Sequence, residues 1–153
     1  MKRHYLVSDT HGNRCFDPFL SLTGDADMYA HLGDYVSDGE ALRQLAPKPV
    51  ITVKGNGDFG NDAPVQEIIS LGGARILLLH GHTVGVKYSL DRLAYLAAEN
   101  DAQCACYGHT HISGIDWVGG ILLVCPGAFG RYEGSYARLS IENGVVVPDL
   151  FTL

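Results

Sequence analysis

The sequence predicts an α/β fold in which two mixed β-sheets pack face to face and helices cover their outer sides. In the first 53 residues, apolar runs of strand length alternate with helical patterns, which is typical of parallel strands joined by helical crossovers. Further along, paired apolar runs flank short glycine-containing turns, which is typical of hairpins. We expect residues 1–153 to form a single domain, because a chain of this size buries roughly 68–70% of its unfolded surface.

The parallel unit is predicted in the N-terminal third. Strands are expected at residues 4–8, 27–32 and 50–53, because each of these apolar runs ends at a glycine or a polar cluster. Helices are expected between them, at residues 14–22 and 38–45. This order favours a parallel sheet with helical connections.

Hairpins dominate the remainder. Gly72-Gly73 and Gly119-Gly120 are strong turn signals between apolar runs, and Leu90, Leu93, Ala94 and Ala97 repeat at helical spacing. We expect one sheet to carry the parallel units and the other the C-terminal hairpins, with Trp117 packed between the sheets. The expected elements are strands at 65–71 and 74–80, a helix at 87–100, and strands at 103–107, 112–118, 121–124, 136–141 and 145–151.

Composition excludes several classes of protein. The chain has 11 basic and 17 acidic residues, a formal net charge of −6. An extended nucleic-acid surface normally shows a basic patch, so none is expected, whereas bound cations would offset part of the negative charge. The four cysteines form no CxxC pair, which indicates a reducing compartment. Apolar runs are too short for a signal peptide or a membrane span, so we expect no membrane partner and a cytoplasmic location.

Five polar clusters carry the chemistry, and each follows an apolar run. Ligands in α/β sheets bind beyond the carboxyl ends of strands, so clusters at several strand ends are expected to converge on one site. The clusters are Asp9-Thr10-His11, Gly33-Asp34, Gly55-Asn56-Gly57-Asp58, His80-Gly81-His82 and Gly108-His109-Thr110-His111.

The residue types in these clusters suit a pair of divalent cations. Mn²⁺, Fe²⁺, Zn²⁺ and Ni²⁺ accept mixed imidazole and carboxylate ligands. Asp9 and His11 can reach one cation from a strand end, and the two oxygens of Asp34 can bridge two cations. Asn56 offers a neutral amide oxygen. Two cations about 3.5–4 Å apart can share a water, lower its pKa toward about 7 and clamp phosphate oxygens.

Each cluster taken alone has a simpler interpretation. Gly-Asp after a strand is usually a turn or a helix cap, and Gly55-Asn56-Gly57-Asp58 is rich in turn formers. His80 could be a hydrogen-bonded imidazole of the core. The metal interpretation is favoured because all five clusters occur in order at predicted strand ends, and independent turns would not all contain ligand-type side chains.

The chain resembles the calcineurin-like metallophosphoesterase superfamily. The family pattern is D-x-H, G-D, G-N-x-D, H and G-H-x-H, and all five blocks stand here between residues 9 and 111. Ser8-Asp9-Thr10-His11-Gly12 and His80-Gly81-His82 are typical of its small single-domain bacterial and archaeal phosphodiesterases, a group related to the retromer subunit Vps29. The resemblance implies a four-layer αββα sandwich.

The resemblance also implies the roles of individual residues. Asp34 would be shared by the two metals, and Asn56 would also face the phosphate, with Asp34, Asn56 and His80 supporting catalysis by a bridging hydroxide and no protein nucleophile. Asp58 would support the site from behind the ligands, and His82 receives no ligand role. His31 could also support the site from behind, because it precedes Gly33-Asp34 in a predicted strand. The implied ligands are Asp9, His11, Asp34 and His111 for the first metal, and Asp34, Asn56, His80 and His109 for the second.

Two positions depart from the family pattern. Many superfamily phosphatases have at position 57 a histidine that is thought to protonate the leaving group, and Gly57 cannot donate a proton. Losing a general acid typically lowers the rate about 10²–10⁴-fold for a poor leaving group, so phosphodiesters or esters with good leaving groups are the expected substrates. At Val124-Cys125-Pro126-Gly127-Ala128 the small group typically has N-P-G-S, so the contacts of those polar side chains are in doubt.

Substrate contacts are harder to predict than metal ligands. Arg14 and Arg131 could reach a substrate phosphate, although a solvated loop arginine is the simpler interpretation of each, and Gly57 leaves room for a bulky substrate. Tyr132 and Tyr136 could line the mouth of the site, although aromatic residues near a hairpin usually cover the core.

The expected function is therefore hydrolysis of a small phosphate ester, with a nucleotide as one candidate, by a protein that could form a homo-oligomer. Two metal ions per chain are expected, with Mn²⁺ favoured over Fe²⁺, Zn²⁺ or Ni²⁺. The alternative is a non-catalytic, metal-binding protein–protein scaffold of the Vps29 type. A structural zinc site is disfavoured, because closed zinc sites prefer four Cys and His ligands.

Overall fold

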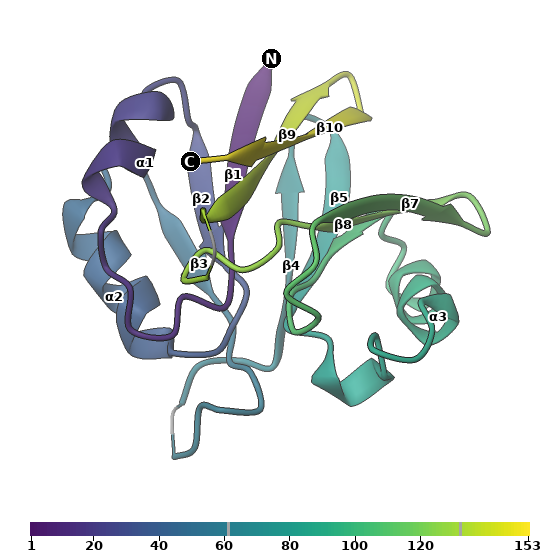
Figure 1. The fold of residues 1–153 in the computed structure, drawn as a ribbon. Helices are drawn as coiled ribbons and strands as arrows, with labels where there is room; N and C mark the ends of the chain where they lie inside the picture. Colours follow the sequence, from purple (N-terminus) through teal and green to yellow (C-terminus); the bar gives the residue numbers. More distant parts are fainter. Residues whose placement is uncertain (61, 132) are drawn as a thin grey trace.

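The computed structural model describes residues 1–60, 62–131 and 133–153, and within these residues two five-stranded sheets form the centre of the protein (Figure 1). The first sheet has the order β10-β9-β1-β2-β3. Strands β1, β2 and β3 run parallel, and β9 runs antiparallel to both β1 and β10. Their bounds are β1 (Lys2–Val7), β2 (Met28–His31), β3 (Val50–Thr52), β9 (Ser135–Glu142) and β10 (Val145–Thr152).

The second sheet has the order β4-β5-β6-β8-β7. Its central strands β5, β6 and β8 are parallel, and each edge is the outer strand of a hairpin, β4 with β5 and β7 with β8. The bounds are β4 (Gln66–Leu71), β5 (Ala74–Leu79), β6 (Cys104–Cys106), β7 (Gly114–Val118) and β8 (Ile121–Cys125).

Apolar faces hold the layers together. Side chains of both sheets, including Leu6, Ile76 and Leu122, are buried against one another in a core between the sheets. The outer face of the first sheet packs with α1 (Asp17–Leu22) and α2 (Val36–Leu45), and that of the second sheet with α3 (Asp91–Glu99). The result is the four-layer αββα arrangement that the sequence predicts, with α1 and α2 on one side and α3 on the other (Figure 1).

Two details of the prediction are wrong. The last hairpin joins the first sheet, because β9 pairs antiparallel with β1, and the second sheet contains parallel strands of its own. Trp117 is not between the sheets: β7 is an edge strand, and Trp117 is 65% exposed. Tyr136 is buried in the core beside α1, as expected of an aromatic cover, whereas Tyr132 lies outside the described residues.

Two helices are shorter than their sequence patterns, whereas α2, expected at 38–45, begins two residues earlier at Val36. The helix expected at 14–22 begins at Asp17, where Pro18 occupies the first turn and supplies a backbone φ suited to it. The helix expected at 87–100 begins at Asp91, whose backbone N–H donates to Ser89 Oγ (3.1 Å). None of the helices in the described ranges is long and apolar enough to cross a membrane.

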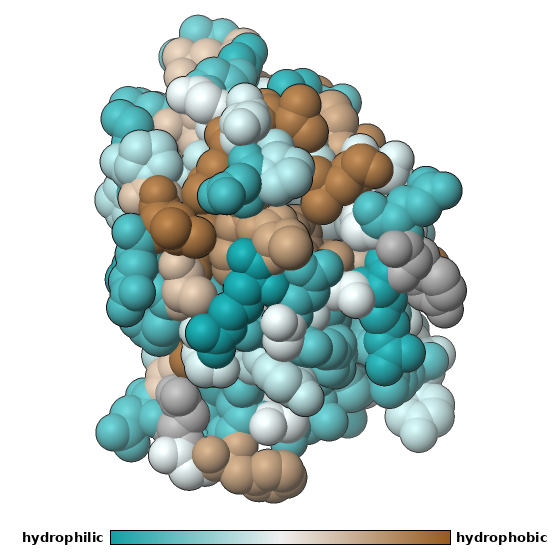
Figure 2. Space-filling model, turned by 60° about the vertical axis from the view of Figure 1, so that its left-hand side comes forward, coloured by the Kyte–Doolittle hydropathy of each residue, from teal (hydrophilic) through white to brown (hydrophobic). Residues whose placement is uncertain are grey.

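The loops that follow several strands gather at one edge of the sandwich. The N-terminus lies at the top of Figure 1, so β1 runs downward, and β2 and β3 run parallel to it. With the side of α1 and α2 turned forward, the strongly hydrophobic residues lie mostly in the upper half, among hydrophilic ones, and the lower half is mostly hydrophilic apart from hydrophobic residues at its base (Figure 2). The polar end of the molecule is therefore the end at which these strands finish.

Candidate metal centre

Loops after β1, β2, β5 and β6 are joined directly at this end. The backbone N–H of Asp9 donates to the Gly33 carbonyl (3.1 Å), and that of Gly108 donates to the His80 carbonyl (3.0 Å). The N–H of His109 donates to Asp9 Oδ2 (3.0 Å). Residues about 100 positions apart in the chain are thus held side by side, because the loop after β1 of the first sheet meets the loop after β6 of the second.

Asp9 lies at the centre of the cluster and is fully buried. Its Oδ2 accepts hydrogen bonds from Ser8 Oγ (2.8 Å) and from the N–H of His109. Its Oδ1 is buried and accepts no hydrogen bond from the described residues. Burying a carboxylate oxygen without a partner costs free energy of folding, so a bound cation is a suitable partner for this atom.

A first group of ligand atoms surrounds this oxygen. His111 Nε2 lies 3.3 Å and His11 Nε2 3.9 Å from Asp9 Oδ1, and the two imidazole nitrogens lie 3.4 Å apart. Donors that share one ion at about 2.1 Å lie roughly 3–4 Å apart, so the three side chains are spaced to hold one metal.

A second group of ligand atoms also includes Asp9. His80 Nε2 is 3.5 Å from Asp34 Oδ1 and 3.9 Å from Asp9 Oδ1, and these three residues are also spaced to share an ion. His109 Nδ1 is 3.2 Å from His80 Nε2. The opposite nitrogen of the buried His80 ring, Nδ1, is 2.8 Å from the Leu32 carbonyl. Donation from Nδ1–H to that carbonyl leaves the Nε2 lone pair facing the group.

The backbone at the site is strained. Five of the seven predicted ligands have positive φ, which is uncommon for residues other than glycine and concentrates at functional sites. Elsewhere among the described non-glycine residues, positive φ occurs at Tyr35, Asp101 and Asn143, and Tyr35 is itself next to a ligand. The five are Asp9 (53°), His11 (48°), Asp34 (54°), His109 (70°) and His111 (64°).

Glycines allow the loops to approach. A Cβ at Gly33 would lie 2.8 Å from His80 Nδ1, and one at Gly55 would overlap Asp34 Oδ1. Gly57 donates its N–H to Asp34 Oδ1 (3.0 Å). Asp58 accepts hydrogen bonds from the N–H groups of Gly55 and Val36 (each 2.8 Å), so it ties its loop to the start of α2. The role that the family resemblance implies for Asp58, support of the site from behind the ligands, stays a prediction.

The predicted substrate residues are placed less tightly. Asn56 is exposed beside Gly57 and stays a predicted ligand. Arg14 is 53% exposed and donates from Nε to Asp38 Oδ1 (2.7 Å). Arg131 is exposed and lines a cavity of about 400 Å³ together with His111. Arg131 therefore shares a cavity with one predicted ligand, whereas Arg14 is paired with the buried carboxylate of Asp38.

His31 lies behind the ligand loops and is fully buried. Burial lowers its pKa to about 4, so the ring is neutral near pH 7. Its Nδ1 accepts the N–H of Gly33 (3.3 Å), and its Nε2 is 2.9 Å from Thr10 Oγ1. These contacts place His31 against the loops of Asp9 and Asp34, and its supporting role stays a prediction.

The second departure from the family pattern, at residues 124–128, has structural consequences. Cys125 lies behind the last ligand loop, with its Sγ 3.7 Å from Thr110 Oγ1, and burial raises the pKa of the thiol to about 11. At position 125, where the small group typically has a polar residue, a protonated thiol thus contacts Thr110, the residue between His109 and His111. Ala128 is buried and lines the same 400 Å³ cavity as Arg131.

Sequence reasoning missed three residues near the site. Thr10 Oγ1 donates to Asp38 Oδ2 (2.6 Å), and the Tyr35 ring lies 5.2 Å from the His11 ring between centroids. In the sequence, Asp38 is an acidic residue in the first turn of a helix. Such a residue usually has only a favourable interaction with the helix dipole, so it does not suggest a site. The pairing with Thr10 has no sequence signal, because it depends on the packing of α2 against the first loop.

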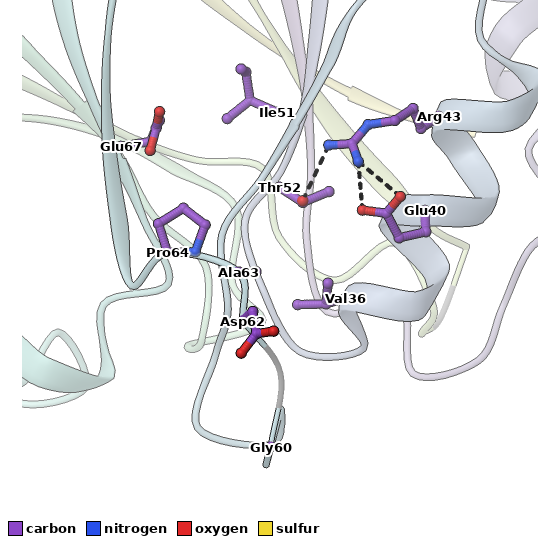
Figure 3. A pocket seen from close by; sticks show the side chains of 10 residues that line it. All are labelled: Val36, Glu40, Arg43, Ile51, Thr52, Gly60, Asp62, Ala63, Pro64 and Glu67. Atoms are coloured by element: carbon purple, nitrogen blue, oxygen red, sulfur yellow. Dashed lines mark hydrogen bonds and ion pairs between the residues drawn. The ribbon is translucent and has the colours of Figure 1, made fainter.

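A cavity of about 610 Å³ lies apart from the candidate metal centre. Figure 3 shows it between α2, β3 and the loop before β4, and Val36 is its lining residue nearest in sequence to Asp34. Arg43 faces it but is engaged by Glu40 (2.6 Å) and by the Val50 carbonyl (2.9 Å). No predicted ligand is among the described residues that line it, so it is not the metal site.

Comparison with known proteins identifies the family. The profile of the calcineurin-like phosphoesterase superfamily domain matches residues 2–144. The chain belongs to the calcineurin-like phosphoesterase superfamily. The probable metallophosphoesterase YsnB of Bacillus subtilis is 35% identical over 144 residues, which cover 90% of this chain and 83% of YsnB. The resemblance predicted from the five blocks is confirmed.

Solved structures agree with this assignment. The structure of a predicted phosphoesterase from Streptococcus pneumoniae has a TM-score of 0.82 and 28% identity, covering 99% of this chain and 89% of that one. Wild-type Vps29 of Entamoeba histolytica, solved in complex with Zn²⁺, has a TM-score of 0.78 and 23% identity, covering 98% of each chain, and so shares the fold. Membership of this phosphoesterase superfamily supports a metal-dependent hydrolase.

Proposed function

We propose that this protein is a binuclear metal-dependent phosphodiesterase that hydrolyses a small phosphate ester, with a nucleotide as a candidate substrate class. The observation that carries the proposal is the buried Asp9 Oδ1, which lacks a hydrogen bond from the described residues and lies 3.3–3.9 Å from three imidazole nitrogens. The donor set of carboxylate and imidazole groups fits Mn²⁺, Fe²⁺, Zn²⁺ or Ni²⁺, and we favour Mn²⁺.

The proposed ligands are the seven that the family pattern names. Asp9, His11 and His111 would hold one cation, and His80 and His109 the other, with Asp34 between them and Asn56 completing the second. Bound there, two divalent cations lower the pKa of a shared water and neutralise charge on phosphate oxygens. The chain itself fixes the donors: the Leu32 carbonyl orients His80, and Ser8 and the His109 N–H orient Asp9.

Preference for diesters follows from Gly57. Its N–H is bonded to Asp34 Oδ1, and an added Cβ would lie 3.2 Å from that oxygen, so a side chain at this position would face the metal cluster. Glycine supplies no proton to a leaving group and leaves space for a second ester substituent. Arg131 and His111 line a 400 Å³ cavity that we propose receives one substituent of the diester.

The test compares substrates under one set of conditions. With Mn²⁺ added, the purified protein should hydrolyse an aryl phosphodiester faster than an alkyl phosphate monoester. Faster hydrolysis of the alkyl monoester would contradict the diester assignment. A protein in which Asp34 is replaced by asparagine is the control for contaminating phosphatases, since activity that survives this change does not come from the proposed centre.

A second candidate function is a non-catalytic, metal-binding scaffold of the Vps29 type. The observation that favours it is the exposure of large apolar side chains on and before the edge strand β7, where Ile112 is 73% and Trp117 65% exposed. Clustered exposed apolar groups often mark protein interaction sites. Absence of turnover with Mn²⁺, Ni²⁺, Zn²⁺ and Fe²⁺ would favour the scaffold over the enzyme.

A further inference from the structure

Asp38 stands in the first turn of α2, yet its carboxylate is fully buried and bonded outside the helix. Oδ2 accepts hydrogen bonds from Thr10 Oγ1 (2.6 Å) and from the N–H of Gly12 (2.7 Å). Oδ1 accepts a hydrogen bond from Arg14 Nε (2.7 Å). All three donors belong to the loop after β1, so this carboxylate is used to hold that loop.

The loop held by Asp38 is the one that presents two proposed metal ligands. Thr10 lies between Asp9 and His11, and Gly12 follows directly. Both ligands have positive φ, at 53° and 48°, which a flexible loop would not maintain unaided. The hydrogen bonds from Thr10 and Gly12 fix the backbone on either side of His11.

The same network continues to the loop after β2. Thr10 Oγ1 uses its hydrogen to bond Asp38, so it accepts the Nε2–H of the neutral His31 ring (2.9 Å). The Nδ1 of His31 is then free to accept the N–H of Gly33 (3.3 Å), the residue before Asp34. Asp38, Thr10 and His31 thus form one hydrogen-bonded chain that joins both ligand loops from behind.

We propose that Asp38 is a positioning residue that sets the affinity of the centre for divalent cations by holding the Asp9–His11 loop and, through Thr10 and His31, the Gly33–Asp34 turn. This rests on the proposed metal centre. Hydrogen-bond partners one step behind metal ligands typically change metal affinity about 10–100-fold when removed. An ordinary first-turn aspartate, which acts only on its own helix, would have no such effect.

The experiment measures Mn²⁺ affinity and metal-free stability separately. Thr10→Val removes the hydroxyl that connects Asp38 to His31, and its φ is not in the left-handed region, so valine is accommodated. Asp38→Leu removes the acceptor for all three donors. The matched control is Thr23→Val, because Thr23 is equally buried and its hydroxyl donates to the Phe19 carbonyl (2.9 Å) beneath α1, outside the site.

Isothermal titration with Mn²⁺ should give a dissociation constant raised about 10–100-fold by Asp38→Leu and about 3–10-fold by Thr10→Val, with Thr23→Val unchanged. The visible spectrum of bound Co²⁺ should also change in Thr10→Val but not in Thr23→Val. Melting temperatures of the three metal-free variants report the purely structural loss. Where Asp38→Leu fails to fold, Thr10→Val carries the test.

The outcomes separate this inference from the function beneath it. If Thr10→Val binds Mn²⁺ as tightly as the wild type while both threonine variants lose similar thermal stability, Asp38 serves only the fold and the inference is overturned. If the wild type itself binds no divalent cation, the metal centre and the inference fall together. Weaker Mn²⁺ binding confined to the Asp38 and Thr10 variants supports the inference.

Discussion

His4 makes the folded protein sensitive to acid, and the effect can be calculated. The side chain is fully buried on the inner face of β1, where Met28 and Leu139 are its neighbours across the strands. Burial lowers its pKa from 6.5 to about 4, partly offset by the backbone of Tyr29. Neither ring nitrogen has a well-formed hydrogen bond from the described residues.

The sign follows from proton uptake. Between pH 4 and 6.5 the unfolded chain holds a proton on His4 that the folded chain does not, so the free energy of unfolding rises with pH across this window. The full shift corresponds to about 3 kcal/mol at low pH, and the share lost between pH 7 and pH 5 is about 2 kcal/mol. Replacing His4 with leucine removes this share, because leucine does not titrate.

Urea unfolding of wild type and His4→Leu in EDTA, followed by far-ultraviolet circular dichroism at pH 7 and pH 5, measures the difference. EDTA keeps metal binding out of the comparison, and the two proteins differ only at residue 4. Between pH 7 and pH 5 the variant should lose about 2 kcal/mol less stability than the wild type. An equal loss in the two proteins would show that His4 is accessible to protons in the folded state.

The remaining predictions concern the site. Asp34→Asn should lower diesterase activity more than about 100-fold, because the residue proposed to serve both metals loses its charge; near-normal turnover in a steady-state assay would remove the shared-ligand assignment. His111→Asn should weaken one of two Mn²⁺ binding events in a titration and spare the other, whereas equal weakening of both would argue against separate groups. Gly57→His should raise turnover of an alkyl diester by up to about 10² relative to an aryl diester, and an unchanged ratio would refute the general-acid argument. Mn²⁺ at about 100 times its dissociation constant should stabilise the protein by about 2.7 kcal/mol for each site it fills, measured by urea unfolding, and no stabilisation would mean no site in the folded state.

The sequence predicted the elements well because strand and helix signals here are local. Glycine pairs between apolar runs place the hairpin turns, and the alternating pattern places β1, β2 and β3 with the helices between them. The predicted place of the last hairpin is wrong because strand order depends on contacts between distant parts of the chain. Strand β9 pairs with β1 across more than 130 residues. Trp117 was misplaced for the same reason, since only the sheet order shows that β7 is an edge.

The sequence predicts which residues gather at the candidate site, but not the hydrogen bonds that hold them there. Asp9, His11, Asp34, His80 and His111 lie together as their strand-end positions suggest, because strands of one direction end at one edge. Their functions as ligands stay predictions, as do Asn56, the cytoplasmic location and the single-domain interpretation. The chain from Asp38 through Thr10 to His31 could not be predicted, because each residue has an ordinary local explanation and only the packing of α2 joins them.

The central claim is that side chains from separate loops hold a pair of cations around Asp34. Its most direct test is a crystal structure of the protein grown with Mn²⁺, with anomalous scattering used to locate the ions. We predict two peaks about 3.5–4 Å apart, with the Asp34 carboxylate reaching both and with His111 and His80 on opposite sides. A single peak that Asp34 does not contact, or density for water alone among these histidines, would contradict the account.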